Sequence, residues 1–404
     1  MSALDGVRVV EMGMWVAGPA AGGMLADWGA DVVKIEPKSG DPMRKFFVAL
    51  SGSKEERCPP FDLYNRGKRS VAIDVGQPDG LRLIERLIET ADVFITNMRP
   101  TFLLRVGLDA ETLMRKHPGL VYASLTAYGL VGPDRDAPGY DMSAFQGRSG
   151  VTDRSTQAGA VPTTLPGGIG DNVTAITLTA GIAAALFHRE RTGEGQLVST
   201  SLLRAAIFSI GMDVSTRLAL GRISNPSSRS KPRNPLFNLY KTGDEKWFWL
   251  VCTESERHWP KVIRALGVPE WGEDSRYLTP RDRRRNSAAL VAAMDDAFAR
   301  RTKAEWADIF RDHDVWWAPI NSVNDLMHDP QVIASGAFAT APWNQAQPDG
   351  LSFNQVTTPV DFSRTAVSLS TPPPAVGAHT DSVLAELGIS SDEITRMRQA
   401  GVIA

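Results

Sequence analysis

Cysteine is scarce in this chain of 404 residues, which contains only Cys58 and Cys252. Neither cysteine has a second cysteine or a histidine at the spacing of a zinc site. This usage disfavours a disulfide framework and predicts residence in a reducing cytoplasm. No two histidines form an H-x-x-x-H pair, so we expect no metal ion. The six histidines are His117, His188, His258, His313, His328 and His379.

Long apolar runs and an excess of one charge are also missing. The nearest candidate for a membrane span, Val173 to Phe187, is short and ends in the charged run HRER. The N-terminus lacks the basic and apolar regions of a signal peptide. A net charge of −2 gives no general attraction to nucleic acid. We therefore expect a small-molecule partner, with no role for nucleic acid or a membrane.

What the sequence does contain is an alternation of β-branched runs with amphipathic helical stretches. Parallel crossovers produce this spacing, so the pattern predicts an α/β fold, with a Rossmann-like parallel sheet in a large domain. The expected strands cover 7–10, 31–35, 70–74, 92–96, 120–125 and 196–200, and helices are expected at 19–28, 78–90 and from Asp171 to about Arg191.

Changes in composition divide the chain further. Residues 135–170 are rich in Gly, Ser, Thr and Pro and predict a long functional loop. The polar, basic stretch 225–235 marks a domain boundary. We expect a large α/β domain at 1–224, a smaller α+β domain at 225–330, and a C-terminal segment at 331–404 that returns to the large domain and ends in a helix at 381–398.

Two common catalytic patterns are absent. The glycines between Gly13 and Gly23 do not form the G-x-G-x-x-G turn of nicotinamide-binding proteins, and no histidine accompanies a G-x-S-x-G elbow. Cations instead follow the ends of several expected strands. Because the carboxyl ends of parallel strands face one crevice, these residues could meet a phosphorylated ligand there, although single surface cations are common.

Asp171 is the most distinctive acidic residue. It follows the glycine-rich run GGIG and opens a helix of about twenty residues. Glycines let a ligand approach the backbone, and the N–H groups at a helix start stabilise negative charge. Aspartate is also an ordinary helix cap. The residues alone leave both interpretations open.

Together these segments resemble family III CoA-transferases, the group that contains formyl-CoA and carnitine CoA-transferases and shares its fold with α-methylacyl-CoA racemase. The resemblance runs through nearly the whole chain. It is carried by LDGVRVVEMG, GADVVKIEP, NRGKRSVAIDV, ADVFITNMRP, PGYD, GGIGDN, HRERTGEGQLVSTSL and PPPAVGAHTDSVLAELG.

The resemblance implies that Asp171 is the catalytic nucleophile of a CoA-transferase. Its carboxylate would attack an acyl-CoA to give a mixed anhydride, and CoA thiolate would then return to form an aspartyl-CoA thioester. An acceptor carboxylate reverses the sequence, between molecules or within one dicarboxylic acyl-CoA. The helix N-terminus is expected to keep Asp171 ionised. CoA acts as a substrate, so no permanently bound cofactor is expected.

The same resemblance assigns further residues. Those expected to bind the CoA nucleotide are Lys38, Lys68, Asn97, Arg99 and Arg105, with Lys68 and Arg105 the firmer choices. Trp15, Val16 and Tyr140 are expected to contact the acyl substrate and, with Phe145, favour a group larger and less polar than formate or oxalate. An interlocked homodimer is also implied.

Two alternatives to CoA transfer stay open at this point. The related racemases pair the aspartate with a histidine in the segment PGYD, where this chain has Tyr140. Tyrosine, with a reference pKa of about 10, is a poorer base than histidine at neutral pH, so transfer is favoured over racemisation. A non-catalytic CoA-binding protein is the other alternative.

Overall fold

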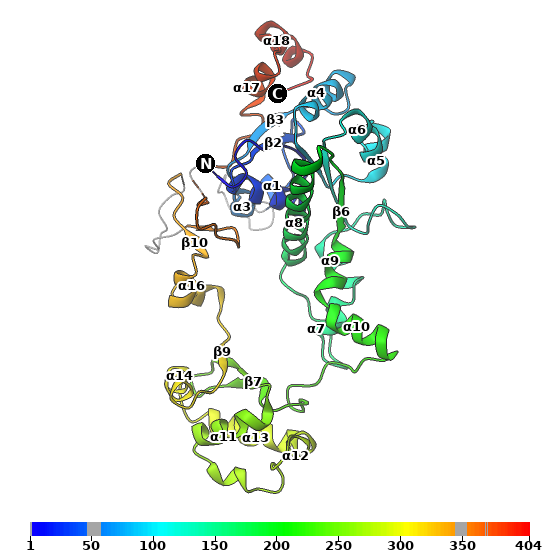
Figure 1. Cartoon of the computed structure of the whole chain (residues 1–404). Coiled ribbons are helices and arrows are strands. Elements are labelled where there is room, and N and C mark those ends of the chain that lie inside the picture. Colours follow the sequence, from blue (N-terminus) through cyan, green and yellow to red (C-terminus); the bar gives the residue numbers. More distant parts are fainter. Residues whose placement is uncertain (1, 47–57, 344–353, 368, 370) are drawn as a thin grey trace. The chain divides into compact units, whose positions relative to one another are not determined.

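Six parallel strands form the central sheet, in the order β3-β2-β1-β4-β5-β6. The computed structural model describes residues 2–46, 58–343, 354–367, 369 and 371–404 (Figure 1). The strands are β1 (Arg8–Met12), β2 (Asp31–Glu36), β3 (Arg69–Ala72), β4 (Val93–Thr96), β5 (Val121–Thr126) and β6 (Leu197–Ser201). The order reverses between β1 and β4, which is where open α/β sheets bind ligands. The predicted Rossmann-like sheet is confirmed.

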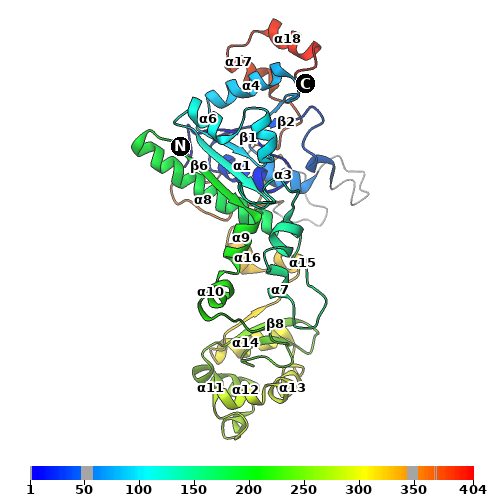
Figure 2. The ribbon, with the colours of Figure 1, turned by 90° about the vertical axis from the view of Figure 1, so that its right-hand side faces the viewer.

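Both faces of this sheet are buried because successive side chains of each strand point to opposite sides. On one face Val9, Val32 and Ile95 pack with helices α1 (Ala17–Asp27) and α8 (Ile169–Thr192). On the other, Val10 and Phe94 pack with a second set of helices. Figures 1 and 2 show α1 and α8 together on one side of the strands. The second set comprises α4 (Pro78–Glu89), α5 (Pro100–Arg105) and α6 (Ala110–Lys116).

The C-terminal residues complete the second face. Helices α17 (Thr380–Glu386) and α18 (Ser391–Gln399) contribute Val383 and Ile394 to the same core. Ile403 forms an antiparallel bridge with Ile73, beyond the end of β3. The final segment was predicted as one helix, but Gly388, with φ +76°, separates two. A left-handed glycine ends a helix easily, because it carries no Cβ.

This unit also contains the long segment that follows β5 and several short elements. It contains the π-helix η1 (Asp141–Gly147) and α7 (Val151–Ser155), so the predicted loop is partly helical. The other elements are α3 (Pro59–Asn65), α9 (Leu202–Ser209), α10 (Gly211–Leu220), and the strand pair β10 (Phe338–Ala339) and β11 (Gln355–Val356).

A second compact unit comprises 154–162 and 223–333, and the first comprises 1–153, 163–222 and 334–404. The second unit contains an antiparallel sheet of β7 (Phe237–Lys241), β8 (Trp247–Val251) and β9 (Trp317–Pro319) with its own core. Its helices are α11 (Ser255–Leu266), η2 (Pro269–Gly272), α12 (Pro280–Arg285), α13 (Ser287–Phe298), α14 (Lys303–Asp312) and α15 (Val323–Leu326), and α16 (Pro330–Ala334) ends at the boundary. The predicted division at 224/225 and 330/331 falls near these limits, but it did not include 154–162.

Helix α8 is the one described helix that is long and apolar enough to cross a membrane by length and composition. Core helices pass the same test. Its buried residues Leu178 and Ile182 belong to the core beneath the sheet.

Candidate active site

The residues singled out from the sequence gather where the parallel strands end. Trp15 follows β1, Lys38 follows β2, and Asn97 follows β4. The segment after β5 runs to the start of α8, which carries Asp171. The amide of Asn97 spans the switch point, because it accepts from the Met14 N–H at 3.0 Å and donates to the Met14 carbonyl at 2.7 Å. Sheet topology therefore places nucleophile and cation candidates at one edge.

Asp171 is the third residue of α8, and Gly168, with φ +87°, is the N-cap. Burial, and then the neighbouring carboxylate of Asp141, raise the pKa of Asp171 to about 7. This raised pKa differs from the sequence expectation that the helix N-terminus helps to keep Asp171 ionised. Two N–H groups at that terminus are directed at another acid.

That acid is Asp141, the first residue of η1. Its Oδ2 accepts from the Gly168 N–H at 2.7 Å and its Oδ1 from the Gly170 N–H at 3.2 Å. Gln146 donates to the same carboxylate at 3.3 Å and also accepts from the Leu165 N–H. Asp141 is 4 % exposed. Asp141, rather than Asp171, therefore caps α8.

Gly170 explains how closely these elements approach. A Cβ at Gly170 would lie 2.3 Å from Asp141 Oδ1 and 2.2 Å from Phe145 Cγ. Any side chain at this position would displace η1 from the start of α8. The glycine-rich run before Asp171 thus has a packing role in addition to the backbone access predicted from it.

Tyr64, on α3, is a neighbour that sequence reasoning missed. Its side chain is hydrogen-bonded to Asn172, and its hydroxyl lies 4.0 Å from where a Gly168 Cβ would be. Burial raises the pKa of Tyr64, and the charge of Asp171 raises it further, so the phenol keeps its proton. Tyr64 directly precedes the segment NRGKRS, and no motif around it marks it as a site residue. Asp141 was visible in PGYD, but only Tyr140 was considered there.

Two of the three residues predicted to bind the acyl group are in contact with each other. The rings of Trp15 and Tyr140 lie edge to face with centroids 6.0 Å apart, and Phe46 packs on Trp15 at 5.5 Å. Val16 lies beside Trp15 against a small apolar cluster. Trp15 has φ +67°, a strained conformation for a bulky residue, and its N–H donates to Asp41 at 3.1 Å. An aromatic surface thus follows β1.

Lys68 is enclosed in the protein. Its Nζ contacts Glu11 Oε2 at 2.6 Å, the Pro19 carbonyl at 2.8 Å and Asn65 Oδ1 at 3.0 Å. Its side chain has no exposed surface. With three partners and no exposed surface, this ammonium group holds β1, α1 and α3 together. The geometry does not support the predicted contact between Lys68 and a nucleotide.

Arg99 and Arg105 are exposed at the two ends of α5. Arg105 lies over the Phe102 ring, 5.4 Å from its centroid. Both guanidinium groups are therefore available to an anionic ligand from the solvent, as the sequence prediction requires. The side chain of Asn97, two residues before Arg99, holds the loop after β1.

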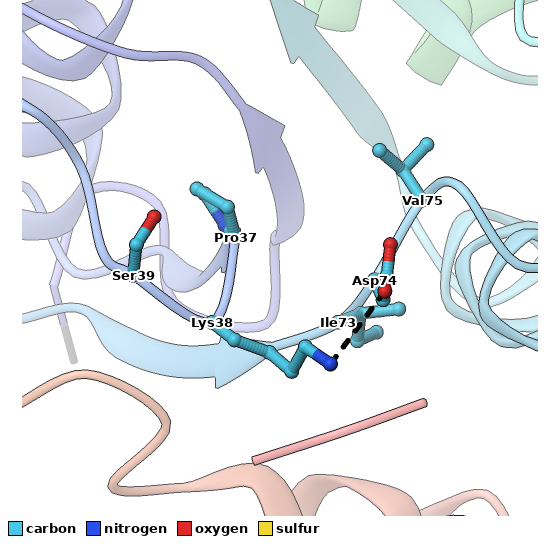
Figure 3. Close-up of a pocket in the computed structure, with 6 residues that line it drawn as sticks. All are labelled: Pro37, Lys38, Ser39, Ile73, Asp74 and Val75. Carbon is cyan, nitrogen blue, oxygen red and sulfur yellow. Dashed lines mark ion pairs between the residues drawn. The ribbon is translucent and has the colours of Figure 1, made fainter. Parts of the chain in front are cut away.

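Lys38 borders a cavity of about 330 Å³ beyond the ends of β2 and β3 (Figure 3). The cavity is lined by Pro37, Lys38, Ser39, Ile73, Asp74 and Val75. The Lys38 ammonium group lies 3.6 Å from Asp74 and donates to the Gly401 carbonyl at 2.5 Å. A cation, a carboxylate and apolar walls could receive a flat polar group there.

Comparison with known proteins identifies the family. The family model described as CoA-transferase family III matches residues 4–380. The chain belongs to CoA-transferase family III. It is 32 % identical over 401 residues to (R)-2-hydroxy-4-methylpentanoate CoA-transferase of Clostridioides difficile, covering 99 % of each chain. It is 31 % identical to cinnamoyl-CoA:phenyllactate CoA-transferase of Clostridium sporogenes, covering 98 % of this chain and 96 % of that protein.

The fold comparison agrees. A CAIB/BAIF family protein from Brucella suis superposes with a TM-score of 0.82 at 30 % identity, over 96 % of this chain and 99 % of the other. The predicted membership in family III is confirmed, and with it the predicted class of enzyme. In this family III CoA-transferase, the described residues contain no group of three or more His, Cys, Asp or Glu side chains arranged to hold a metal ion.

Proposed function

We propose that this family III CoA-transferase moves CoA from an acyl-CoA to a carboxylic acid, with the Asp171 carboxylate as nucleophile. The observation that carries the proposal is the position of Asp171. It is a partly buried acid, with a pKa near 7, at the sheet edge where the cation candidates and an aromatic surface also lie. A partly buried acid whose pKa is raised to about neutral pH is a candidate for covalent chemistry.

The reaction divides into balanced steps. An Asp171 oxygen attacks the thioester carbonyl, the C–S bond breaks, and CoA leaves as thiolate from a mixed anhydride. The thiolate then attacks the Asp171 acyl carbon and releases the first carboxylate, which leaves an aspartyl-CoA thioester. The acceptor carboxylate repeats both steps in reverse order. Transfer needs no second base, which agrees with tyrosine at position 140.

We assign the CoA nucleotide to Lys38, Arg99 and Arg105, with Asn97 holding the adjacent loop after β1 and the 330 Å³ cavity beside Lys38 as the place for the flat base. Lys68 is left out because it is enclosed. Trp15, Val16 and Tyr140 would meet the acyl group. Their aromatic and aliphatic surfaces favour branched or aromatic acids over formate or oxalate, and the named substrates of the two curated relatives are branched or aromatic acids.

One experiment tests the proposal against its alternatives. The protein is incubated with acetyl-CoA and with branched and aromatic acyl-CoAs, then treated with hydroxylamine and analysed by peptide mass spectrometry. We expect a hydroxamate on Asp171, formed best with the larger acyl groups. An unlabelled protein that exchanges the α-hydrogen of a 2-methylacyl-CoA with deuterated solvent would identify a racemase. Binding of CoA without either reaction would leave a CoA-binding protein.

Arg105→Ala is expected to raise the KM for acyl-CoA about tenfold with little change in kcat, because a charged hydrogen bond to phosphate contributes ~1.5 kcal/mol. The effect should shrink at high salt, since the site is exposed. Arg115→Ala, which removes another exposed cation from α6, is the matched control. Equal KM values for the two variants would remove Arg105 from the nucleotide site.

We further propose that the protein is a homodimer in the cytoplasm. Large apolar side chains are exposed on three helices of the first unit, a pattern that marks association surfaces. They are Ile176 and Phe187 on α8, Phe208 on α9, and Met212, Leu218 and Leu220 on α10. Sedimentation equilibrium at micromolar concentration should give twice the chain mass of 43.9 kDa. A species of 43.9 kDa across that range would contradict the dimer.

A further inference from the structure

Two carboxylates meet at the start of α8, and the transfer mechanism uses only one of them. Asp141 is almost fully buried and comes from η1, thirty residues before Asp171 in the sequence. Its carboxylate accepts hydrogen bonds from the N–H groups of Gly168 and Gly170, which flank Ile169 just before the nucleophile. Gly170 allows this approach because it carries no side chain.

We propose, on the basis of the function proposed above, that Asp141 is a positioning residue that fixes the turn before Asp171 and withholds the helix N-terminal donors from the nucleophile. A carboxylate deprived of these donors is less stabilised as an anion and reacts more readily with a thioester. The arrangement thus activates Asp171 without a separate base.

The two charges also favour the covalent intermediates. Like charges in a shared buried site repel. When Asp171 is acylated or carries CoA, its side chain is neutral and this repulsion ends. Asp141 therefore raises the free energy of the free enzyme relative to the anhydride and the aspartyl-CoA thioester. The raised pKa of Asp171 agrees with this geometry.

Charged groups on the elements that pack against α8 do not change this argument. Tyr64 from α3 stays protonated. On α1, Asp27 is paired with Arg66 at 2.6 Å, and on α9, Arg204 is exposed. Strands β5 and β6 carry no charged residues. Among the described residues, Asp141 is the charged neighbour that raises the pKa of Asp171.

The test is Asp141→Asn, measured by two readouts that a purely structural change would not move. The first is the pH at which transfer reaches half its maximum. In the wild type, kcat/KM should rise as the pH passes about 7. In the variant that midpoint should fall by about one unit or more, because a like charge has been removed. The second is the fraction of enzyme held as aspartyl-CoA thioester with acyl-CoA alone, which should fall at least about tenfold for the same reason.

Asp109→Asn is the matched control, because Asp109 caps α6 by accepting from the Thr112 N–H, away from Asp171. Asp109→Asn should leave both the pH midpoint of transfer and the fraction of enzyme held as aspartyl-CoA thioester unchanged. An Asp141→Asn enzyme with the wild-type midpoint and thioester fraction would overturn the inference. Should that variant not fold, a wild-type profile that is flat from pH 5 to 9 would overturn it as well. Absence of any thioester in the wild type would instead refute the proposed function.

Discussion

Asp171→Asn is expected to abolish CoA transfer and, above pH 7, to make the fold more stable. Loss of a covalent nucleophile lowers the rate by about 10³-fold or more. Binding of CoA, measured by calorimetry, should be largely retained because the cations lie on other elements. Transfer at the wild-type rate would contradict the role of Asp171.

The stability measurement separates a nucleophile from an ordinary helix cap. The pKa of Asp171 is raised from about 3.9 when unfolded to about 7 when folded. The native state therefore binds its proton more tightly, and stability is lost as the pH rises from about 4 through 7. Removing the acid should raise the urea midpoint at pH 8 and leave it nearly unchanged below pH 4. If Asp171 were an ordinary helix cap, Asp171→Asn would instead lower the free energy of unfolding by about 1 kcal/mol.

Much of this site could be predicted from the sequence, because topology brings distant segments to one edge. The run of parallel strands predicted the sheet, and GGIGDN predicted the helix start that carries Asp171. Trp15 and Tyr140 were expected in one substrate site, and their rings are in contact. Residues that follow strands of a parallel sheet share an edge whatever their separation in the chain.

What could not be predicted is which polar groups pair in the interior. The residues next to Lys68 in the sequence do not distinguish it from an exposed cation, yet Lys68 is buried and paired with Glu11 from β1. From the sequence, Asp171 was the expected partner of the helix N-terminus, and only the fold shows that Asp141 accepts from the Gly168 and Gly170 N–H groups. Such assignments depend on contacts between residues far apart in sequence, for which periodicity and motif spacing carry no signal.

The second large effect is expected from the ion cluster that the fold builds beneath the site. Glu11 Oε1 lies 2.9 Å from Lys34 Nζ, Glu11 Oε2 lies 2.6 Å from Lys68 Nζ, and none of these side chains is exposed. Lys34 also contacts Asp41, 3.0 Å away, which accepts the Trp15 N–H. The cluster therefore links the sheet core to the strained turn at Trp15.

Glu11→Gln should lower the free energy of unfolding at pH 7 by about 3–5 kcal/mol, because two buried ammonium groups lose their shared counter-ion. Glu85→Gln, which breaks a surface pair with Lys116, is the control and should cost at most about 1 kcal/mol. Urea unfolding of both variants measures the difference. Equal losses would show that the buried cluster contributes no more than an exposed pair.

The pH dependence of the Glu11→Gln defect identifies Lys68 as its source. Burial lowers the pKa of Lys68 to about 8, although Glu11 opposes the shift. The native state therefore binds fewer protons than the unfolded chain, whose lysine titrates near 10.4, and stability falls as the pH falls through that window. Without Glu11 the pKa of Lys68 drops further, and the pH range over which stability falls extends below pH 8. The difference between variant and wild type should thus be larger at pH 7 than at pH 9. A defect of constant size would assign the loss to packing instead of to the uncompensated charge.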